Sequence, residues 1–147
     1  TLKAFLPNMI KKNHGHIVAI SSLAAYFTGP YGTVYCPTKF AVKAMMESLS
    51  EELRILSNGK SSIKFTTIYP FFVHTGICKP KFRFPLIMRE LLPQKVASSI
   101  IDAQRRNYEN KSISSYWLPI LKIIRLLPDA ALKCVTDFSG IYVEPEN

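Results

Sequence analysis

Cysteine, acidic residues and long apolar runs are all scarce in this sequence of 147 residues. The three cysteines, Cys36, Cys78 and Cys134, are odd in number and widely scattered, which excludes a disulfide framework or a zinc spacing and favours a reducing compartment. No apolar run approaches the roughly 20 residues of a membrane-spanning helix, and no basic-then-apolar leader opens the chain. We therefore expect neither a membrane span nor a secreted protein.

The composition is that of a folded protein, with 48% hydrophobic and 20% charged residues. The length suits one domain with a core of its own. The 19 basic residues exceed the 10 acidic ones, for a net charge of +9, and the excess is spread over both halves. Such a diffuse excess favours an ordinary solvated surface first. An acidic partner, such as anionic lipid or a phosphate-bearing cofactor, comes second, and nucleic acid comes last.

The first half of the sequence has the alternation of a parallel α/β unit. The apolar spacing predicts a helix over residues 2–12, and an unbroken apolar run predicts a strand over 16–20, buried on both faces. Residues 23–34 have the glycine and proline content of a loop. A long helical pattern covers 35–56, and a second strand is predicted over 63–69. A strand, a helix and a strand in this order form a parallel crossover.

The second half is less regular. Residues 76–92 predict a long loop with short helical pieces, and 93–106 predict a helix with one apolar face. Residues 113–117 suit a short third strand, and a two-turn helix is expected between Pro119 and Pro128. That helix, with Trp117 at its mouth, suits either a membrane interface or packing on the sheet or across a dimer.

These elements make only part of an open sheet. The first strand would have an unpaired edge, although it is strongly apolar, and the opening helix has no capping residue. We therefore expect the C-terminal half of a Rossmann-like, doubly wound parallel sheet with helices on both faces.

Two side chains in the 35–56 helix suggest chemistry. Tyr35 and Lys39 are four residues apart and so share one helical face, where the ammonium favours the phenolate form of the tyrosine. The spacing by itself is weak evidence, because it also describes an ordinary exposed pair. Ser22 strengthens it, because this serine follows the first strand, and the carboxyl ends of strands line the ligand crevice of open α/β sheets. Together the three suit the polarisation of a carbonyl or alcohol oxygen.

With these residues, the sequence resembles the short-chain dehydrogenase/reductase family. The strand that ends in Ser21-Ser22 and the Tyr35-x-x-x-Lys39 motif followed by Phe40-Ala41-Val42 are similar to that family's catalytic segments. The segment Pro70-Phe71-Phe72-Val73-His74-Thr75 resembles its nicotinamide-binding segment. The resemblance covers residues 1 to about 76. It implies NAD or NADP as the cofactor.

Carried over to this sequence, the resemblance assigns a role to each motif residue. Tyr35 is expected to act as the general acid/base, and Lys39 to support it and bind the nicotinamide ribose. Ser22 is expected to hydrogen-bond the substrate oxygen, while Ser21 has a structural role. The cofactor would also contact Pro70, Val73 and Thr75.

The resemblance also has departures. Phe71 stands where the family usually has glycine or a small polar residue, which leaves the local backbone path open. The glycine-rich phosphate turn, the Asn-Ala-Gly motif and the catalytic asparagine of the family are not in this sequence. Residues 1–76 would be the catalytic part of the dinucleotide-binding domain. Residues 77–147 would be its substrate-binding loop and C-terminal helical region.

Within the family, the sequence is most similar to the epidermal retinol dehydrogenases and lipid-droplet 17β-hydroxysteroid dehydrogenases. The residues that carry this are His14-Gly15-His16-Ile17-Val18, Tyr35-Cys36, Lys39-Phe40-Ala41, Lys64 to Thr67, and Val73 with Thr75-Gly76. The similarity implies a hydrophobic alcohol as substrate, such as retinol or a hydroxysteroid. It also implies the cytosolic face of the endoplasmic reticulum or of a lipid droplet, and a homodimer formed through residues 35–56.

Three alternatives complete the expectations. His14-x-His16 is expected to be a turn pair rather than a metal site, because no third ligand is suitably spaced. The basic and aromatic stretch 79–84 is not expected to bind nucleic acid, because no nucleic-acid-binding fold accompanies it. The alternative function is a catalytically silent protein of a lipid surface or a dimer that keeps part of the fold.

Overall fold

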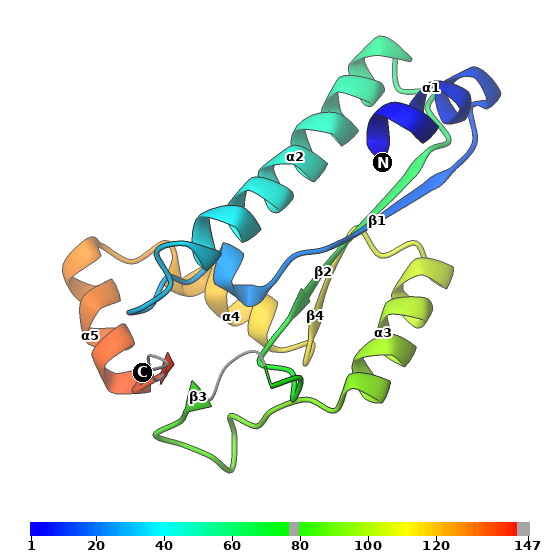
Figure 1. The fold of residues 1–147 in the computed structure, drawn as a ribbon. Helices are drawn as coiled ribbons and strands as arrows, with labels where there is room; N and C mark the ends of the chain where they lie inside the picture. Colours follow the sequence, from blue (N-terminus) through cyan, green and yellow to red (C-terminus); the bar gives the residue numbers. More distant parts are fainter. Residues whose placement is uncertain (77–79, 144–147) are drawn as a thin grey trace.

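The computed structural model describes residues 1–76 and 80–143 (Figure 1). Its elements, in chain order, are α1 (Leu2–Lys12), β1 (His16–Ile20), the 3-10 helix η1 (Leu23–Ala25), α2 (Tyr35–Leu56), β2 (Lys64–Pro70), β3 (Pro80–Lys81), α3 (Pro93–Arg105), β4 (Asn110–Ile113), α4 (Trp117–Ile124), α5 (Asp129–Ser139) and β5 (Tyr142–Val143). β1, β2 and β4 form a parallel sheet in the order β1-β2-β4, and β3 pairs antiparallel with β5. The expected α/β fold is confirmed.

The crossover from β1 through α2 to β2 is the most regular part of the molecule. β1 and β2 pair in parallel from His16 opposite Lys64 to Ile20 opposite Ile68. α2 has the predicted bounds and ends before Asn58 and Gly59, which both adopt a positive φ. The structure therefore confirms the crossover, with β2 starting one residue later than predicted.

Helices cover both faces of the sheet, with α2 on one side and α3 on the other (Figure 1). The alternation of side chains along β2 divides the core accordingly. Tyr69 joins a cluster with residues of η1 and α4, whereas Ile68 joins a cluster with residues of α3. Adjacent residues of one strand thus belong to two cores, as expected of a sheet with helices on both faces.

β1 is less buried than its apolar sequence predicts. In the described part of the chain it pairs with β2 alone, and Val18 and Ile20 are exposed. The prediction that this strand is buried on both faces is therefore wrong for this chain. The reason is the open edge of β1, because no strand among the described residues lies beside it on the side away from β2.

The C-terminal part differs from the sequence expectation in four places. The third strand is β4 at Asn110–Ile113 rather than 113–117, and the helix expected up to Pro128 is α4, which begins at Trp117 and ends at Ile124. α5 was not predicted. The loop over 76–92 contains no helix in its described residues, only a turn at 84–88 and the short strand β3.

Ser112 explains the misplaced strand. It is buried in β4 although it is polar, because its hydroxyl accepts from the backbone N–H of Leu118 and donates to the carbonyl of Ser115. Strand prediction from apolar runs overlooks a buried position of this kind.

Of the three cysteines, Cys36 is buried and free, and Cys134 is exposed and free. Cys78 and the start of the 79–84 basic stretch lie outside the described residues. Within the ranges that are described, no helix is both long and apolar enough to cross a bilayer.

Candidate active site

The predicted site residues gather at one end of the parallel sheet. Because β1 and β2 are parallel and in register up to Ile20 and Ile68, their carboxyl ends lie side by side. Ser21 and Ser22 follow β1, the segment 71–75 follows β2, and α2 begins near the same end (Figure 1). This is the edge at which open α/β sheets bind their ligands.

Tyr35 and Lys39 meet on the first turn of α2. The Lys39 ammonium lies 5.4 Å from the centre of the Tyr35 ring and donates to the carbonyl oxygen of Ile20 at 3.3 Å. The Tyr35 side chain is 49% exposed. A cation is thus held between a phenol and the end of β1, and the phenol remains open to a ligand.

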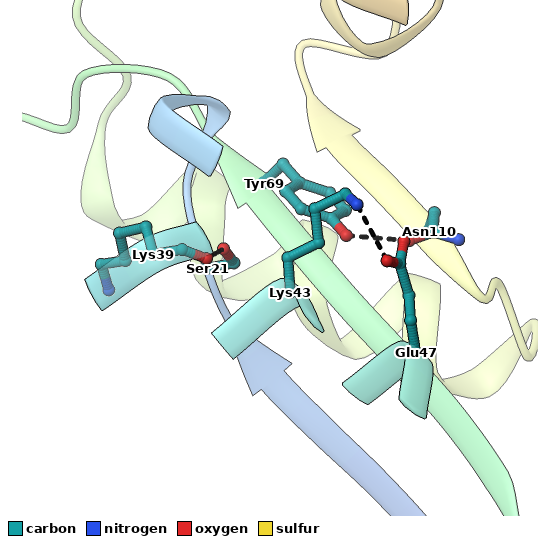
Figure 2. Close-up of polar contacts among 6 residues, drawn as sticks. All are labelled: Ser21, Lys39, Lys43, Glu47, Tyr69 and Asn110. Carbon is teal, nitrogen blue, oxygen red and sulfur yellow. Dashed lines mark hydrogen bonds and ion pairs between the residues drawn. The ribbon is translucent and has the colours of Figure 1, made fainter. Parts of the chain in front are cut away.

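The two adjacent serines have different partners. Ser21 is buried, and its hydroxyl donates to the backbone carbonyl of Lys39 at 2.9 Å, which ties α2 to the end of β1 (Figure 2). The Ser22 oxygen instead accepts from the N–H of Ala24 at 3.1 Å and caps η1. Because Ser22 acts as an acceptor in this bond, its hydroxyl proton is available to a substrate oxygen.

The structure does not join Ser22 to Tyr35 directly, since no hydrogen bond links them in the described part of the chain. Lys39 instead links the others around the end of β1, because its carbonyl accepts from Ser21 and its ammonium lies over the Tyr35 ring. A substrate oxygen would have to bridge the serine and the phenol.

The segment after β2 is held by backbone hydrogen bonds. Pro70, the last residue of β2, is buried, and Val73 forms a parallel bridge with Leu91. Thr75 closes a tight turn, because its N–H and its hydroxyl both donate to the carbonyl of Val73, at 2.8 and 3.3 Å. Val73 and Thr75 therefore stand on a fixed backbone next to the end of β2.

Phe71 is the residue that departs from the family pattern. It extends the hydrogen bonding between β2 and β4, since its N–H donates to the carbonyl of Ile113 at 3.0 Å. Its ring stacks between two others, 5.5 Å from Phe82 and 5.3 Å from Trp117, with interplanar angles of 27° and 19°. The large side chain is therefore accommodated by α4 and by the residues after β3.

Sequence reasoning missed a polar cluster beneath α2. The Tyr69 hydroxyl donates to Asn110 at 2.9 Å, and Lys43 pairs with Glu47 at 2.8 Å (Figure 2). The Lys43 ammonium also lies 5.1 Å from the centre of the Tyr26 ring. Burial, together with a hydrogen bond to Tyr26, raises the pKa of Tyr69, so that this phenol stays protonated and acts as a donor.

This cluster supports the site without touching it, because it lies where α2 packs against β2, and Tyr69 in turn joins β2 to β4. One signal in the sequence could have revealed it. Lys43 follows Lys39 by four residues, so both ammonium groups lie on the face of α2 that carries Tyr35.

No metal site accompanies these residues. Across residues 1–76 and 80–143, no group of three histidine, cysteine or acidic side chains could hold an ion. His16 instead shares a hydrogen bond of 2.8 Å with the Thr66 hydroxyl. Burial, and the nearby charge of Lys64, lower the pKa of this histidine.

The residues present fit one end of a nicotinamide nucleotide. The exposed Tyr35 hydroxyl and the Lys39 ammonium offer hydrogen bonds to ribose hydroxyls, and Thr75 offers a hydroxyl close to the backbone of Val73. A pyrophosphate needs a turn of exposed N–H groups at a helix start, usually built with glycine. The described residues contain no glycine-rich turn between a strand and a helix.

The chain is similar in sequence to known proteins of one family. Residues 1–85 match the family model described as short chain dehydrogenase. The rat (Rattus norvegicus) 17-beta-hydroxysteroid dehydrogenase 13 is 34% identical over 144 residues, which cover 97% of this chain and 46% of that protein. The bovine (Bos taurus) short-chain dehydrogenase/reductase family 16C member 6 is 42% identical over 106 residues, which cover 70% of this chain and 32% of that protein.

Retinol dehydrogenase 10-B of Danio rerio is 34% identical over 147 residues, covering 95% of this chain and 42% of that protein. Among solved structures, a short chain dehydrogenase/reductase from Burkholderia phymatum in complex with NAD superposes with a TM-score of 0.66. It is 20% identical and is matched over 90% of this chain and 54% of its own, which is a likeness of fold. The chain spans about half the length of the curated relatives it matches.

Proposed function

This chain belongs to the short-chain dehydrogenase family, and we propose that it forms the catalytic part of an oxidoreductase that interconverts a hydrophobic alcohol and its carbonyl compound. The observation that carries the proposal is the Lys39 ammonium, held between the Tyr35 ring and the Ile20 carbonyl at the carboxyl end of the sheet. Relatives named as hydroxysteroid and retinol dehydrogenases support it.

The cofactor of the proposed reaction is NAD or NADP. When bound, a nicotinamide nucleotide accepts or donates the hydride. Lys39 and Tyr35 would hold its ribose, and Pro70, Val73 and Thr75 would line the nicotinamide. A nicotinamide cofactor is common to this family, and the NAD complex of the structural neighbour agrees with it.

The chain's own residues move the proton. In the direction of alcohol oxidation, the Tyr35 oxygen accepts the proton of the substrate hydroxyl, and in the reverse direction it returns that proton to the carbonyl oxygen. Lys39 stabilises the negative charge that Tyr35 carries between these events. The hydroxyl of Ser22 donates to the substrate oxygen and stabilises the charge developing there.

Retinol or a hydroxysteroid is the proposed substrate, because a bulky apolar alcohol suits the surroundings of the site. Phe71 directly follows β2, on the chain segment that leads to Val73 and Thr75, and its ring stacks on those of Phe82 and Trp117. In this arrangement residues 1–76 supply the catalysis, and residues 77–147, of which 77–79 and 144–147 lie outside the described ranges, supply the substrate-binding surface.

A homodimer through α2 and a location on the cytosolic face of the endoplasmic reticulum or a lipid droplet complete the proposal. The dimer is supported by a groove of about 440 Å³ between α1 and α2, lined largely by apolar side chains such as Leu6, Met45 and Leu49. Phe5 and Ile10 on α1 are also exposed. Sedimentation of the protein before and after Met45→Glu would test it, with a loss of dimer expected.

The test of function is turnover by the native-length protein, followed through the fluorescence of reduced NAD or NADP with retinol and with hydroxysteroids. We expect oxidation of at least one of these alcohols by the natural protein, at a rate that Tyr35→Phe reduces by about a thousandfold. Tyr108→Phe, at the other end of the sheet next to β4, is the matched control and should leave turnover intact. An absence of turnover with every alcohol would favour the silent lipid-surface protein, and undiminished turnover by Tyr35→Phe would contradict the mechanism.

A further inference from the structure

The two side chains that the proposed mechanism places on the substrate oxygen belong to different elements. Ser22 follows β1 and caps η1, whereas Tyr35 begins α2. Because the Ser22 oxygen accepts from Ala24 and has no bond to Tyr35, the substrate oxygen must bridge the two groups. Bridging requires a fixed separation, since a shift of about 1 Å can cost a large part of the rate. Other contacts must therefore fix η1 relative to α2.

The loop that connects η1 to α2 is a poor candidate for this task. Residues 27–34 form no helix or strand, and none of them is buried. Tyr31 and Val34 are 68% and 83% exposed. A segment without buried side chains opens at a low cost in free energy. The loop therefore contributes little to the distance between Ser22 and Tyr35.

Tyr26 belongs to the same tight turn as Ser22. It directly follows η1, and its N–H donates to the carbonyl of Leu23 at 2.9 Å. The N–H groups of Ala24 and Ala25 donate to the hydroxyl and the carbonyl of Ser22, at 3.1 and 3.0 Å. Because these hydrogen bonds join the whole turn, a displacement of Tyr26 would move Ser22 with it.

The buried Tyr26 ring lies between β2 and α2. It meets the Tyr69 ring of β2 edge-on, with 5.1 Å between ring centres and an interplanar angle of 67°. On α2, the Lys43 ammonium lies 5.1 Å from the centre of the Tyr26 ring and pairs with Glu47 at 2.8 Å. Tyr69 is itself fixed, because it is buried and its hydroxyl donates to Asn110 of β4 (Figure 2). Both ring contacts are directional, so they define where Tyr26 lies.

We propose that Tyr26 is a positioning residue of the candidate active site, whose ring holds Ser22 at a distance from Tyr35 that a substrate oxygen can bridge. The ring contacts with β2 and α2 fix η1, and η1 fixes the direction of the Ser22 hydroxyl. The bond from Ser21 to α2 fixes the end of β1 but not the turn that follows it. The inference rests on the proposed function, in which Ser22 donates to the substrate oxygen.

Because both contacts are made by the ring, two substitutions of Tyr26 should differ. Tyr26→Leu keeps an apolar side chain but removes both ring contacts, so it should lower kcat by about fivefold. The KM of the nucleotide should stay unchanged, because η1 carries none of the residues assigned to the cofactor. Tyr26→Phe keeps the ring, and its kcat should stay within about twofold of the natural value. Steady-state kinetics with the best alcohol substrate measures these values.

A double-mutant cycle tests whether Tyr26 acts through Ser22. In a Ser22→Ala background, Tyr26→Leu should lower kcat no further, because the group that it positions is already absent. Lys43→Ala removes one of the two ring contacts and should be equally silent in that background, which keeps the cycle available if Tyr26→Leu does not fold. Val96→Ala is the matched control, because Val96 is buried in the core beneath α3, away from η1. It should destabilise the fold without changing kcat.

Amide hydrogen exchange of the native-length protein gives a second readout that does not depend on turnover. Tyr26→Leu should speed the exchange of residues 22–27 several-fold, because the turn loses its contacts with β2 and α2. Tyr26→Phe and Val96→Ala should leave the exchange of this segment as it is in the natural protein.

Several outcomes would overturn the positioning role of Tyr26. They are an undiminished kcat in Tyr26→Leu, an equal loss in Tyr26→Phe or Val96→Ala, and a full further loss in the Ser22→Ala background. If the natural protein oxidises no alcohol, the proposed function fails, and hydrogen exchange still decides whether Tyr26 holds the turn. Faster exchange of residues 22–27 in Tyr26→Leu alone would support that role, and unchanged exchange would contradict it.

Discussion

The unit from β1 to β2 and the region from β4 to α5 differ in the kind of side chain that characterises them. In the first, Ser21 and Lys39 use their hydrogen bonds to hold a helix start against the strand ends, where the candidate chemistry lies. In the second, apolar side chains both fill the core and remain on the surface, as Leu118 and Ile123 of α4 illustrate. If the proposed function is right, the chemistry would depend on the first region and the approach of an apolar substrate on the second.

The largest effect on stability is expected where the two regions share a core. Leu118→Ala should lower the free energy of unfolding by about 3 kcal/mol, because it leaves a cavity between α4, η1 and Tyr69. Urea denaturation measures this, with Ile120→Ala, on the exposed side of the same helix, as a control expected to change it by less than about 1 kcal/mol. Two separate unfolding transitions would show that the regions do not share one cooperative core.

Variants of Lys39 and Lys43 distinguish a residue of the candidate site from a residue of the polar cluster that supports it, because both lie on α2. Lys39→Ala should lower kcat/KM by about a hundredfold, because it removes the cation beside the Tyr35 ring on which the proposed proton transfer depends. Lys43→Ala removes a contact with Glu47 and the Tyr26 ring, so it should change kcat/KM only a few-fold. Steady-state kinetics with the best alcohol substrate measures both, and equal losses in the two variants would place Lys39 among the supporting residues.

Variants of the two adjacent serines should differ in a smaller but similar way, with an effect on stability at Ser21 and an effect on turnover at Ser22. Ser21→Ala should lower the free energy of unfolding by about 1 kcal/mol, because it leaves the Lys39 carbonyl without its donor. Ser22→Ala should lower kcat by about tenfold through the loss of a donor to the substrate oxygen. Thermal unfolding and turnover should be measured on both, and a kinetic loss that appears only in Ser21→Ala would reverse the assignment.

The smallest expected effect comes from His16, at the start of β1. Its pKa is lowered in the folded protein, so the unfolded chain binds the proton more readily. The stability that this histidine contributes is therefore fully present above a pH of about 6.5 and decreases as the pH falls below that value. Urea denaturation at several pH values should show a shallower decrease for His16→Gln, and an unchanged pH dependence would contradict this account.

The sequence predicts the first region better than the second, for physical reasons. The repeat of apolar residues such as Phe40, Met46 and Leu53 was sufficient to place α2 with its observed bounds. β4 was displaced because Ser112 is buried with its hydrogen bonds satisfied, and an apolar-run criterion does not detect such a residue. α5 was not predicted, and burial does not explain this, because α1 also has no fully buried side chain and was predicted with its observed bounds.

The candidate site can also be predicted from the sequence only in part. Helical spacing was enough to predict that Tyr35 and Lys39 share a face, and the structure confirms their proximity. Which of Ser21 and Ser22 turns toward α2 depends on the chain path after β1, so it required the structure. The catalytic and cofactor-binding roles of Ser22, Tyr35, Lys39, Pro70, Val73 and Thr75 remain predictions.

The most direct test of the account is to follow deuterium from the carbinol carbon of the alcohol. The native-length protein is incubated with retinol or a hydroxysteroid labelled at that carbon and with NAD or NADP, and the nucleotide is analysed by mass spectrometry. We predict deuterium on the nicotinamide ring with the natural protein, at a rate that Tyr35→Phe reduces by about a thousandfold. Unlabelled nucleotide with every alcohol, or equal labelling by Tyr35→Phe, would contradict the central claim that Tyr35 and Lys39 form an oxidoreductase site.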